Sequence, residues 1–453
     1  MHERTQQAIA RLLFVLCCAT PCMLVTLWII VTGTGWYQHQ VASSIKKEIQ
    51  EQLGLEADFD DFKHPTPNRW IFSNLRLSHP ETSALISTIR TAQWVNDSDE
   101  TRMLLEQPEV ESRQIAILWQ SFHDQILCRP KKLGHPVTIS VNDLTIHSGN
   151  NAVTLSEIDA WIANESFSSS ASIQLQVADS LSHAPIVMQV QRDREANITS
   201  ETLNPSTTVT LSTNGTPLPC SAFNDFWPTL GSMGSSATFS GNLKWKDEPD
   251  GWTVDLGGSR FDDIELDRLF ENQSHRLSGS ATIQLERCLI SPAQKKSDIT
   301  GTLYAEQGLI GKDLLQSAGK NLNLHLLETD AWSQFSGDLP YDVLAISFNI
   351  NGTQLQLEGL CRNVRGYENY PAGIAMVLNG YPLAQSSEKS MESLRLLSTI
   401  APNHSVPVPL SQQTNWLTKV LIPPSRPLPA GTTTDPRIRS ARVWQGGPIV
   451  EQP

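Results

Sequence analysis

VTISVNDLTIHSGNNAVTL, residues 137–155, carries the pattern that decides the fold. Its apolar residues recur mostly at every second position, on both sides of a turn: Val137, Ile139, Val141, Leu144, Ile146, Val153 and Leu155. Because successive side chains of a strand point to opposite faces, this period predicts two strands with one apolar face. The run Ser148-Gly149-Asn150-Asn151 supplies turn residues between them, so we expect an antiparallel hairpin.

The same period continues along the chain. It recurs in short segments: Trp70, Phe72, Leu75 and Leu77; Ile173, Leu175 and Val177; Ile186, Met188 and Val190; Val209 and Leu211; Ile346, Phe348 and Ile350; Leu355 and Leu357. Asn351-Gly352 between the last two segments is the strongest hairpin signal in the chain. The sequence therefore predicts a mainly β region over 57–400, built as an elongated, groove-like antiparallel sheet with few short helices.

Other elements are expected around these strands. The apolar run of Ile115, Ile117, Leu118 and Trp119 predicts a further buried strand, and 391–397 predicts a helix. Two loosely similar segments, 236–270 and 280–315, each predict strands followed by a small helix, as an internal repeat would. Chance similarity between β-rich segments is the alternative.

The N-terminal region predicts a membrane anchor. Residues 12–31, LLFVLCCATPCMLVTLWIIV, contain no charge and are long enough for a helix to span the hydrocarbon core of a bilayer. A cleaved signal peptide is the alternative, although its apolar region is usually shorter and ends at a small-residue site. Arg4 and Arg11 precede the span, which favours a cytoplasmic segment 1–11 and a single pass. Residues 32–56 follow as a linker, whose apolar period over 41–53 predicts an amphipathic helix that ends at Gly54.

Composition restricts the partners. The net charge of -13 argues against a nucleic-acid surface, which needs basic residues to neutralise phosphates. Ten of the 27 prolines follow residue 401, so 401–453 reads as an extended or disordered tail. Its arginines allow either a solvated linker or contact with an anionic partner.

Chemical motifs are sparse. The chain contains no zinc-protease, serine-hydrolase or phosphate-loop motif. His123 and Asp124 are adjacent, and in a strand they would point to opposite faces; the pairs Asp60-Asp61 and Asp262-Asp263 are typical of solvated turns. Outside the apolar span the cysteines are far apart and either form disulfides or stay free: Cys128, Cys220, Cys288 and Cys361. We therefore predict no enzyme, no metal site and no cofactor.

The layout resembles that of the AsmA-like proteins of Gram-negative envelopes. The resemblance covers about residues 10–330 in pattern, and it lies in the anchor, GLEA at 54–57, WIFSNLRLSHP at 70–80, VNDLTI at 141–146, LSEI at 155–158 and FSGNL at 239–243. It implies an inner-membrane anchor, a periplasmic β-rich groove, and a part in lipid transport or outer-membrane homeostasis. This chain is shorter than the bridge-forming members, so we do not expect it to span the periplasm.

Two functions follow as hypotheses. In the first, the ectodomain handles membrane lipids for envelope biogenesis, and acyl chains lie on the apolar sheet face, with one set of candidate residues: Ile346, Phe348, Ile350, Leu355 and Leu357. In the second, the β region is a structural adaptor that scaffolds envelope protein partners. The period-two pattern fits an open groove and a closed core equally.

Overall fold

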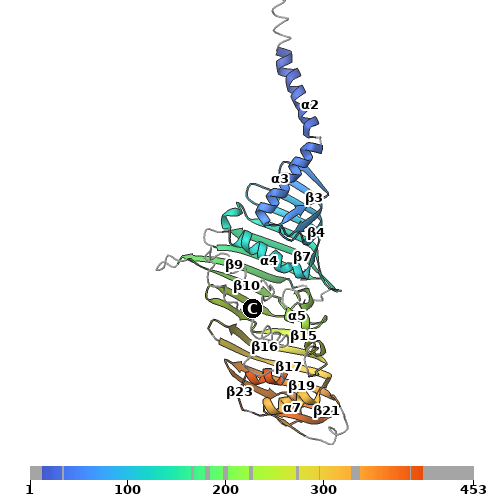
Figure 1. Cartoon of the computed structure of the whole chain (residues 1–453), viewed down its shortest axis with the longest axis vertical. Coiled ribbons are helices and arrows are strands. Elements are labelled where there is room, and N and C mark those ends of the chain that lie inside the picture. Colours follow the sequence, from blue (N-terminus) through green and yellow to red (C-terminus); the bar gives the residue numbers. More distant parts are fainter. Residues whose placement is uncertain are drawn as a thin grey trace, which may run out of the picture.

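The computed structural model describes residues 13–32, 35–149, 151–164, 168–178, 184–196, 203–223, 228–271, 275–294, 296–327, 337–387 and 389–400. The chain is mainly β, as predicted, and its strands belong to one long sheet (Figure 1). The expected N-terminal segment 1–11 and the expected tail 401–453 lie outside the described residues.

The N-terminal helices lead into the sheet. A π-helical turn, η1 (Val15–Ala19), precedes α2 (Thr20–Thr32), and α3 (Gly35–Leu53) follows. None of the described helices is both long and apolar enough to cross a membrane. The predicted amphipathic helix is confirmed in α3, whose Ile45, Ile49 and Leu53 face the first strands. Gly54 ends it with a φ of 73°, which glycine adopts without strain.

The first strands surround β3, the centre of the N-terminal end. The elements are β1 (Glu56–Asp58), β2 (Asp61–Thr66), β3 (Arg69–Ser78), β4 (Leu85–Asn96) and β5 (Thr101–Glu111). Strand β3 pairs antiparallel with β1, β2 and β4, and β4 pairs antiparallel with β5.

A crossover follows β5 and corrects two expectations. It contains η2 (Ser112–Gln114), α4 (Ile115–Phe122), the π-helical η3 (His123–Leu127) and η4 (Pro130–Lys132). The strand predicted at 115–119 is wrong: Ile115, Trp119 and Phe122 recur at helical spacing and give α4 one apolar face. The crossover also returns the chain so that β6 (Val137–Ser148) runs parallel to β5, which makes the sheet mixed rather than wholly antiparallel.

The predicted meander is confirmed beyond this point. Strand β6 pairs with β7 (Asn151–Asn164), and β8 (Ser168–Val177), β9 (Ile186–Ala196) and β10 (Leu203–Ser212) follow antiparallel in chain order. A connection then carries β11 (Leu218–Pro219), η5 (Cys220–Phe223) and α5 (Pro228–Ser232).

The two segments of the expected repeat each form antiparallel strands followed by a helix, but the first has four strands and the second has two. The first contains β12 (Thr238–Ser240), β13 (Asn242–Glu248), β14 (Gly251–Asp255), β15 (Ser259–Glu265) and α6 (Leu266–Leu269). The second contains β16 (Ser280–Ser291), β17 (Lys296–Ile310) and α7 (Lys312–Asn321). Strand β13 joins this region to β10, and β16 pairs with both β14 and β15.

The C-terminal end of the sheet is built on β19. Its elements are β18 (Leu324–Leu326), β19 (Leu339–Asn351), β20 (Gln354–Gly359), η6 (Cys361–Asn363), β21 (Ile374–Leu378), β22 (Tyr381–Ser386), β23 (Met391–Glu392) and α9 (Leu394–Ile400). The hairpin predicted at Asn351-Gly352 is confirmed between β19 and β20. The helix predicted over 391–397 is partly right, because its first residues form β23.

Candidate functional site

The strand register places apolar side chains in one unbroken row across the sheet. Each residue of the row is the cross-strand partner of the next: Trp70, Trp94, Met103, Ile139, Ala160, Ile173, Met188, Leu211 and Leu243. Neighbouring strands lie about 4.8 Å apart, so the row runs for about 40 Å from β3 to β13. The length of the row therefore exceeds the thickness of a bilayer's hydrocarbon core, which is about 30 Å.

A second set of rows continues the apolar face towards the C-terminus. Phe261, Ile283, Leu303 and Ile346 are successive partners, as are Leu285, Gly301, Phe348 and Leu357, and Cys288, Ile299, Ile350 and Leu355. Each strand has apolar residues at every second position, and the strand register aligns these residues on one face of the whole sheet.

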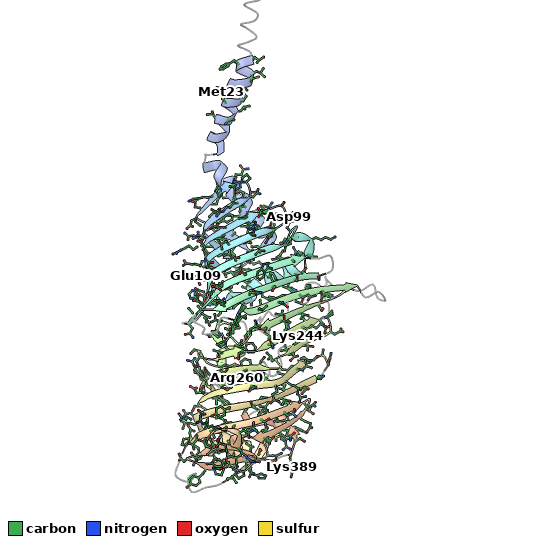
Figure 2. The ribbon with its side chains drawn as sticks, turned by 180° about the vertical axis from the view of Figure 1, so that it is seen from behind. Met23, Asp99, Glu109, Lys244, Arg260 and Lys389 are labelled. Atoms are coloured by element: carbon green, nitrogen blue, oxygen red, sulfur yellow. The ribbon has the colours of Figure 1, made fainter. Side chains whose placement is uncertain are left out.

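Helices cover part of this apolar face. Figure 1 shows α3, α4 and α7 in front of the strands, whereas Figure 2 shows the strands from the opposite side. Several side chains of the rows remain only half-buried: Ile139, Ile173, Met188, Leu211, Leu243 and Leu303. The apolar face is therefore neither a closed core nor fully open.

The rear face is polar. Gln189, Thr210 and Lys244 alternate with the row residues Met188, Leu211 and Leu243 and share a cross-strand register. They border a shallow hollow of about 270 Å³ between β9, β10 and β13. Lys244 and Arg260 appear on the side seen in Figure 2.

The five residues predicted to face lipid lie together on β19 and β20. Phe348 pairs with Leu357 and Ile350 with Leu355, on the apolar face. Leu355 and Leu357 are buried, whereas Ile346, Phe348 and Ile350 are half-buried. All five pack with residues of α7 and with Met391 in one cluster, so α7 covers this part of the face.

A glycine shapes the same region. Gly301 is the cross-strand partner of Phe348, and a Cβ at this position would lie 2.9 Å from the Phe348 ring and 2.5 Å from a backbone oxygen of Gln284. A larger residue would push the aromatic ring off the sheet.

A buried ionic network lies at the margin of the apolar face. Arg192 of β9 is 3% exposed and places Nη1 3.2 Å from Nε2 of His123 in η3; it also donates to the Thr207 hydroxyl at 2.5 Å. On the other side of the ring, Nδ1 of His123 lies 2.9 Å from Oδ1 of Asp124 and 3.7 Å from Sγ of Cys128. The expectation that His123 and Asp124 point apart is wrong, because they lie in a π-helical turn and not in a strand.

The network shifts two pKa values. Burial opposes a charge on His123, but the hydrogen bonds with Asp124 and Cys128 outweigh burial and the nearby Arg192, and raise its pKa to about 9. Asp247 of β13 pairs in register with Thr207, and burial raises its pKa to about 6, against the attraction of His123 and Arg192.

This network contains residue types that catalytic and metal sites use, and the potential ligand atoms of His123, Asp124 and Cys128 lie within 4.8 Å of one another. Sγ of Cys128 lies 3.7 Å from Nδ1 and 3.9 Å from Nε2 of His123, but the thiol is buried, and a nucleophile with no access to solvent cannot meet a substrate. His, Asp and Cys are metal-binding residue types, but the Arg192 guanidinium beside the ring repels a cation. We interpret the group as an ionic network that joins η3 to the sheet.

The acidic pairs are ordinary surface groups. Asp60 accepts from Arg76 at 2.8 Å, and a hydrogen bond from Asn74 holds its pKa below the usual value. Asp262 pairs with Arg260 at 2.7 Å. Neither pair brings two carboxylates towards a common cation.

The cysteines outside the apolar span are free and buried: Cys128, Cys220, Cys288 and Cys361. Of the two open alternatives, disulfides or free thiols, the structure has the second. Burial raises the pKa of Cys220 to about 12 and those of Cys288 and Cys361 to about 11, so these three thiols stay protonated at neutral pH.

Comparison with known proteins adds no relative: no protein-family model, no curated protein and no solved structure matches the chain.

Proposed function

We propose that this chain is a non-catalytic lipid-handling protein of the cell envelope, anchored in the inner membrane with its sheet in the periplasm. In this proposal acyl chains lie along the apolar face of the sheet, as they would in an AsmA-like protein. The observation that carries the proposal is the unbroken apolar row from Trp70 to Leu243.

The energetics of the row favour an apolar ligand. Half-buried side chains such as Met188, Leu211 and Leu243 still expose apolar surface, and each Å² removed from water contributes about 25 cal/mol. An acyl chain laid along the row would bury that surface continuously. Because the ligand is held by area rather than by directional bonds, such a face would accept many lipids.

The N-terminal helix supports the membrane anchor. Its apolar side chains are exposed: Leu13, Phe14 and Met23 by 61%, 63% and 78%. Figure 1 shows α2 standing clear of the sheet, so the protein itself does not bury these side chains. Apolar surface of this extent is stable in a bilayer and unfavourable in water.

Photo-crosslinking in cells tests the lipid function. We expect a photo-reactive amino acid in place of Leu243, in the full chain, to give lipid adducts that mass spectrometry of the intact protein detects. The same amino acid in place of Lys244 is the matched control, since Lys244 is the next residue and is exposed on the rear face. Equal lipid yields at both positions would contradict the proposal, and protein adducts at Leu243 without lipid would favour the adaptor function.

A reporter fusion tests the anchor. Alkaline phosphatase fused to the C-terminus of the full chain should be active in a bacterial host, because the enzyme folds only outside the cytoplasm, and the chain should pellet with membranes. A chain with Val25 and Leu24 both replaced by Lys should lose membrane attachment, because each charge in the span is costly. An inactive fusion would reverse the proposed orientation, and a shortened soluble product would show cleavage.

A further inference from the structure

The rear face of the sheet carries an exposed indole close to the hollow. Trp161 of β7 alternates with Ala160 and Ile162, and Ile162 packs with η3 at the apolar face, so the indole points to the rear. Trp161 is 41% exposed. Tryptophan has a large apolar ring that folding usually buries, so an indole left open on a polar face is available to a ligand.

The strand register places Trp161 in the same cross-strand row as the side chains around the hollow. Each residue of this rear row is the partner of the next: Trp161, Ser172, Gln189, Thr210, Lys244 and Asp255. The row crosses from β7 to β14 and is about 24 Å long at the usual strand spacing. Ser172 is small, so no bulky side chain stands between the indole and Gln189. The rear row is thus an elongated surface that suits an extended chain.

The polar side chains of the hollow are available for hydrogen bonds. Among the described residues, the side chains of Gln189, Thr210, Asn242 and Lys244 have no hydrogen-bond or ion-pair partner. Asp255 accepts one bond, from the backbone N–H of Gly257 at 2.8 Å through Oδ1. Amides and hydroxyls both donate and accept, an ammonium group donates, and a carboxylate accepts. The hollow therefore presents donors and acceptors side by side (Figure 2 shows Lys244 on this face).

Charge and hydrogen bonding together select the class of ligand. Lys244 and Asp255 are cross-strand partners of opposite charge, and the other polar side chains of the hollow are neutral. Such a site does not favour a polyanion, which needs an excess of basic residues. A sugar ring is neutral, and its hydroxyls both donate and accept. The C–H groups on its face also stack on the negative face of an indole, as at Trp161.

We propose that the rear row binds a polysaccharide strand, with one sugar ring stacked on Trp161 and another seated in the hollow on Gln189, Asn242 and Lys244. The hollow, of about 270 Å³, lies just below the range of about 300–1,000 Å³ of small-molecule pockets, which suits one ring of a longer chain. The sheet separates the hollow from acyl chains on the opposite face, so the source is a polysaccharide and not a lipid headgroup. This inference does not rest on the lipid function.

Binding of soluble oligosaccharides to the full chain in detergent tests the proposal. The probes are cellohexaose, chitohexaose and maltohexaose, which are neutral chains that differ in linkage or substituents, and the method is isothermal titration calorimetry. At least one probe should bind, and more tightly than its monosaccharide, because two sites on one surface act together. Absence of binding for all three at millimolar concentration would overturn the proposal, as would equal affinities for the chain and for the single sugar.

Substitution of the indole tests its part in binding. W161A should lower the affinity for the bound oligosaccharide at least about tenfold, because the stacking surface is lost. Y381A is the matched control, since Tyr381 is an aromatic residue 59% exposed on β22, far along the sheet. It should leave the affinity unchanged. Full affinity in W161A, or an equal loss in Y381A, would refute the role of Trp161.

A second variant keeps the test independent of the folding of W161A. Asn242 is exposed in the hollow, so N242A should melt like the parent and bind the oligosaccharide at least about threefold more weakly, because its amide no longer bonds the sugar. Circular dichroism measures the melting of both variants. An N242A variant that melts and binds like the parent would show that the hollow takes no sugar.

Photo-crosslinking at Gln189 in cells distinguishes the occupants. A photo-reactive amino acid at this position should give adducts that release sugar fragments, without acyl chains, in mass spectrometry. Adducts with acyl chains would assign the hollow to a lipid headgroup and peptide adducts to a protein, and either result would overturn the proposal. Lipid adducts at Leu243 should be equal in W161A and in the parent, so the lipid function and the polysaccharide site succeed or fail separately.

Discussion

Replacing Leu355 with Asp should unfold the C-terminal end of the sheet. Leu355 is fully buried on β20 and packs against α7 and Met391. A carboxylate there would be buried without a partner, which costs several kcal/mol or forces the group to take up a proton. Thermal unfolding, followed by circular dichroism, should show a large loss of stability, and limited proteolysis should cut first within β18 to β23.

The next residue provides the control for this prediction. Gln356 is exposed on the opposite face of β20, so Gln356→Asp introduces the same charge and should leave unfolding nearly unchanged. A Leu355→Asp variant that melts like the parent would show that this part of the face is open in solution. It would then favour the original assignment of the hairpin residues to a lipid-facing surface.

Replacing Arg192 with Ala should destabilise the centre of the sheet by about 3–5 kcal/mol, the usual cost of removing one partner from a buried ionic group. The substitution leaves the Thr207 hydroxyl and His123 without the guanidinium that they contact, and it opens a cavity beneath η3. Chemical denaturation of the full chain in detergent measures the loss. The effect should exceed that of Arg192→Met, which keeps most of the volume.

Gln189→Ala is the matched control for Arg192. Gln189 lies on the same strand, but it is exposed on the rear face, and its truncation should change stability by less than about 0.5 kcal/mol. If Arg192→Ala and Gln189→Ala have the same effect, the network does not hold η3 on the sheet.

The strands were predictable because each one carries its own signal. A period of two, as in 137–155, and a turn such as Asn351-Gly352 act over a few residues, and both hairpins form where the pattern places them. The apolar face was predictable in the same way. The length of the apolar face was not predictable from the sequence, because it depends on the strand register that connects Trp70 to Leu243 across nine strands.

The helical crossover between β5 and β6 could not be predicted from the sequence, for a physical reason. A short apolar run such as Ile115–Trp119 fits a buried strand and a helix equally well, and periodicity alone cannot separate them. The same error affected the expectation for His123 and Asp124. Their side chains contact each other only because the backbone is π-helical there.

One signal for the ionic network was present in the sequence. Arg192 continues the alternation of Ile186, Met188 and Val190, and Asp247 continues that of Leu243 and Trp245. A charged residue at a position that the period assigns to the apolar face predicts a buried partner. The identity of that partner depends on the fold, because His123 is distant in sequence.

The order in which the strands pair determines how such a chain can change in length. Apart from the crossover, most strands pair with neighbours in sequence, and the two strand–helix segments, β12 to α6 and β16 to α7, follow one another along the sheet. Stability in such an array is close to a sum of local terms and of contacts between adjacent units, as in solenoid proteins. A duplicated hairpin inserted beside β16–β17 would lengthen the array by two strands and leave both ends intact. The reach of the molecule is therefore set by unit number, which gene duplication can alter one module at a time.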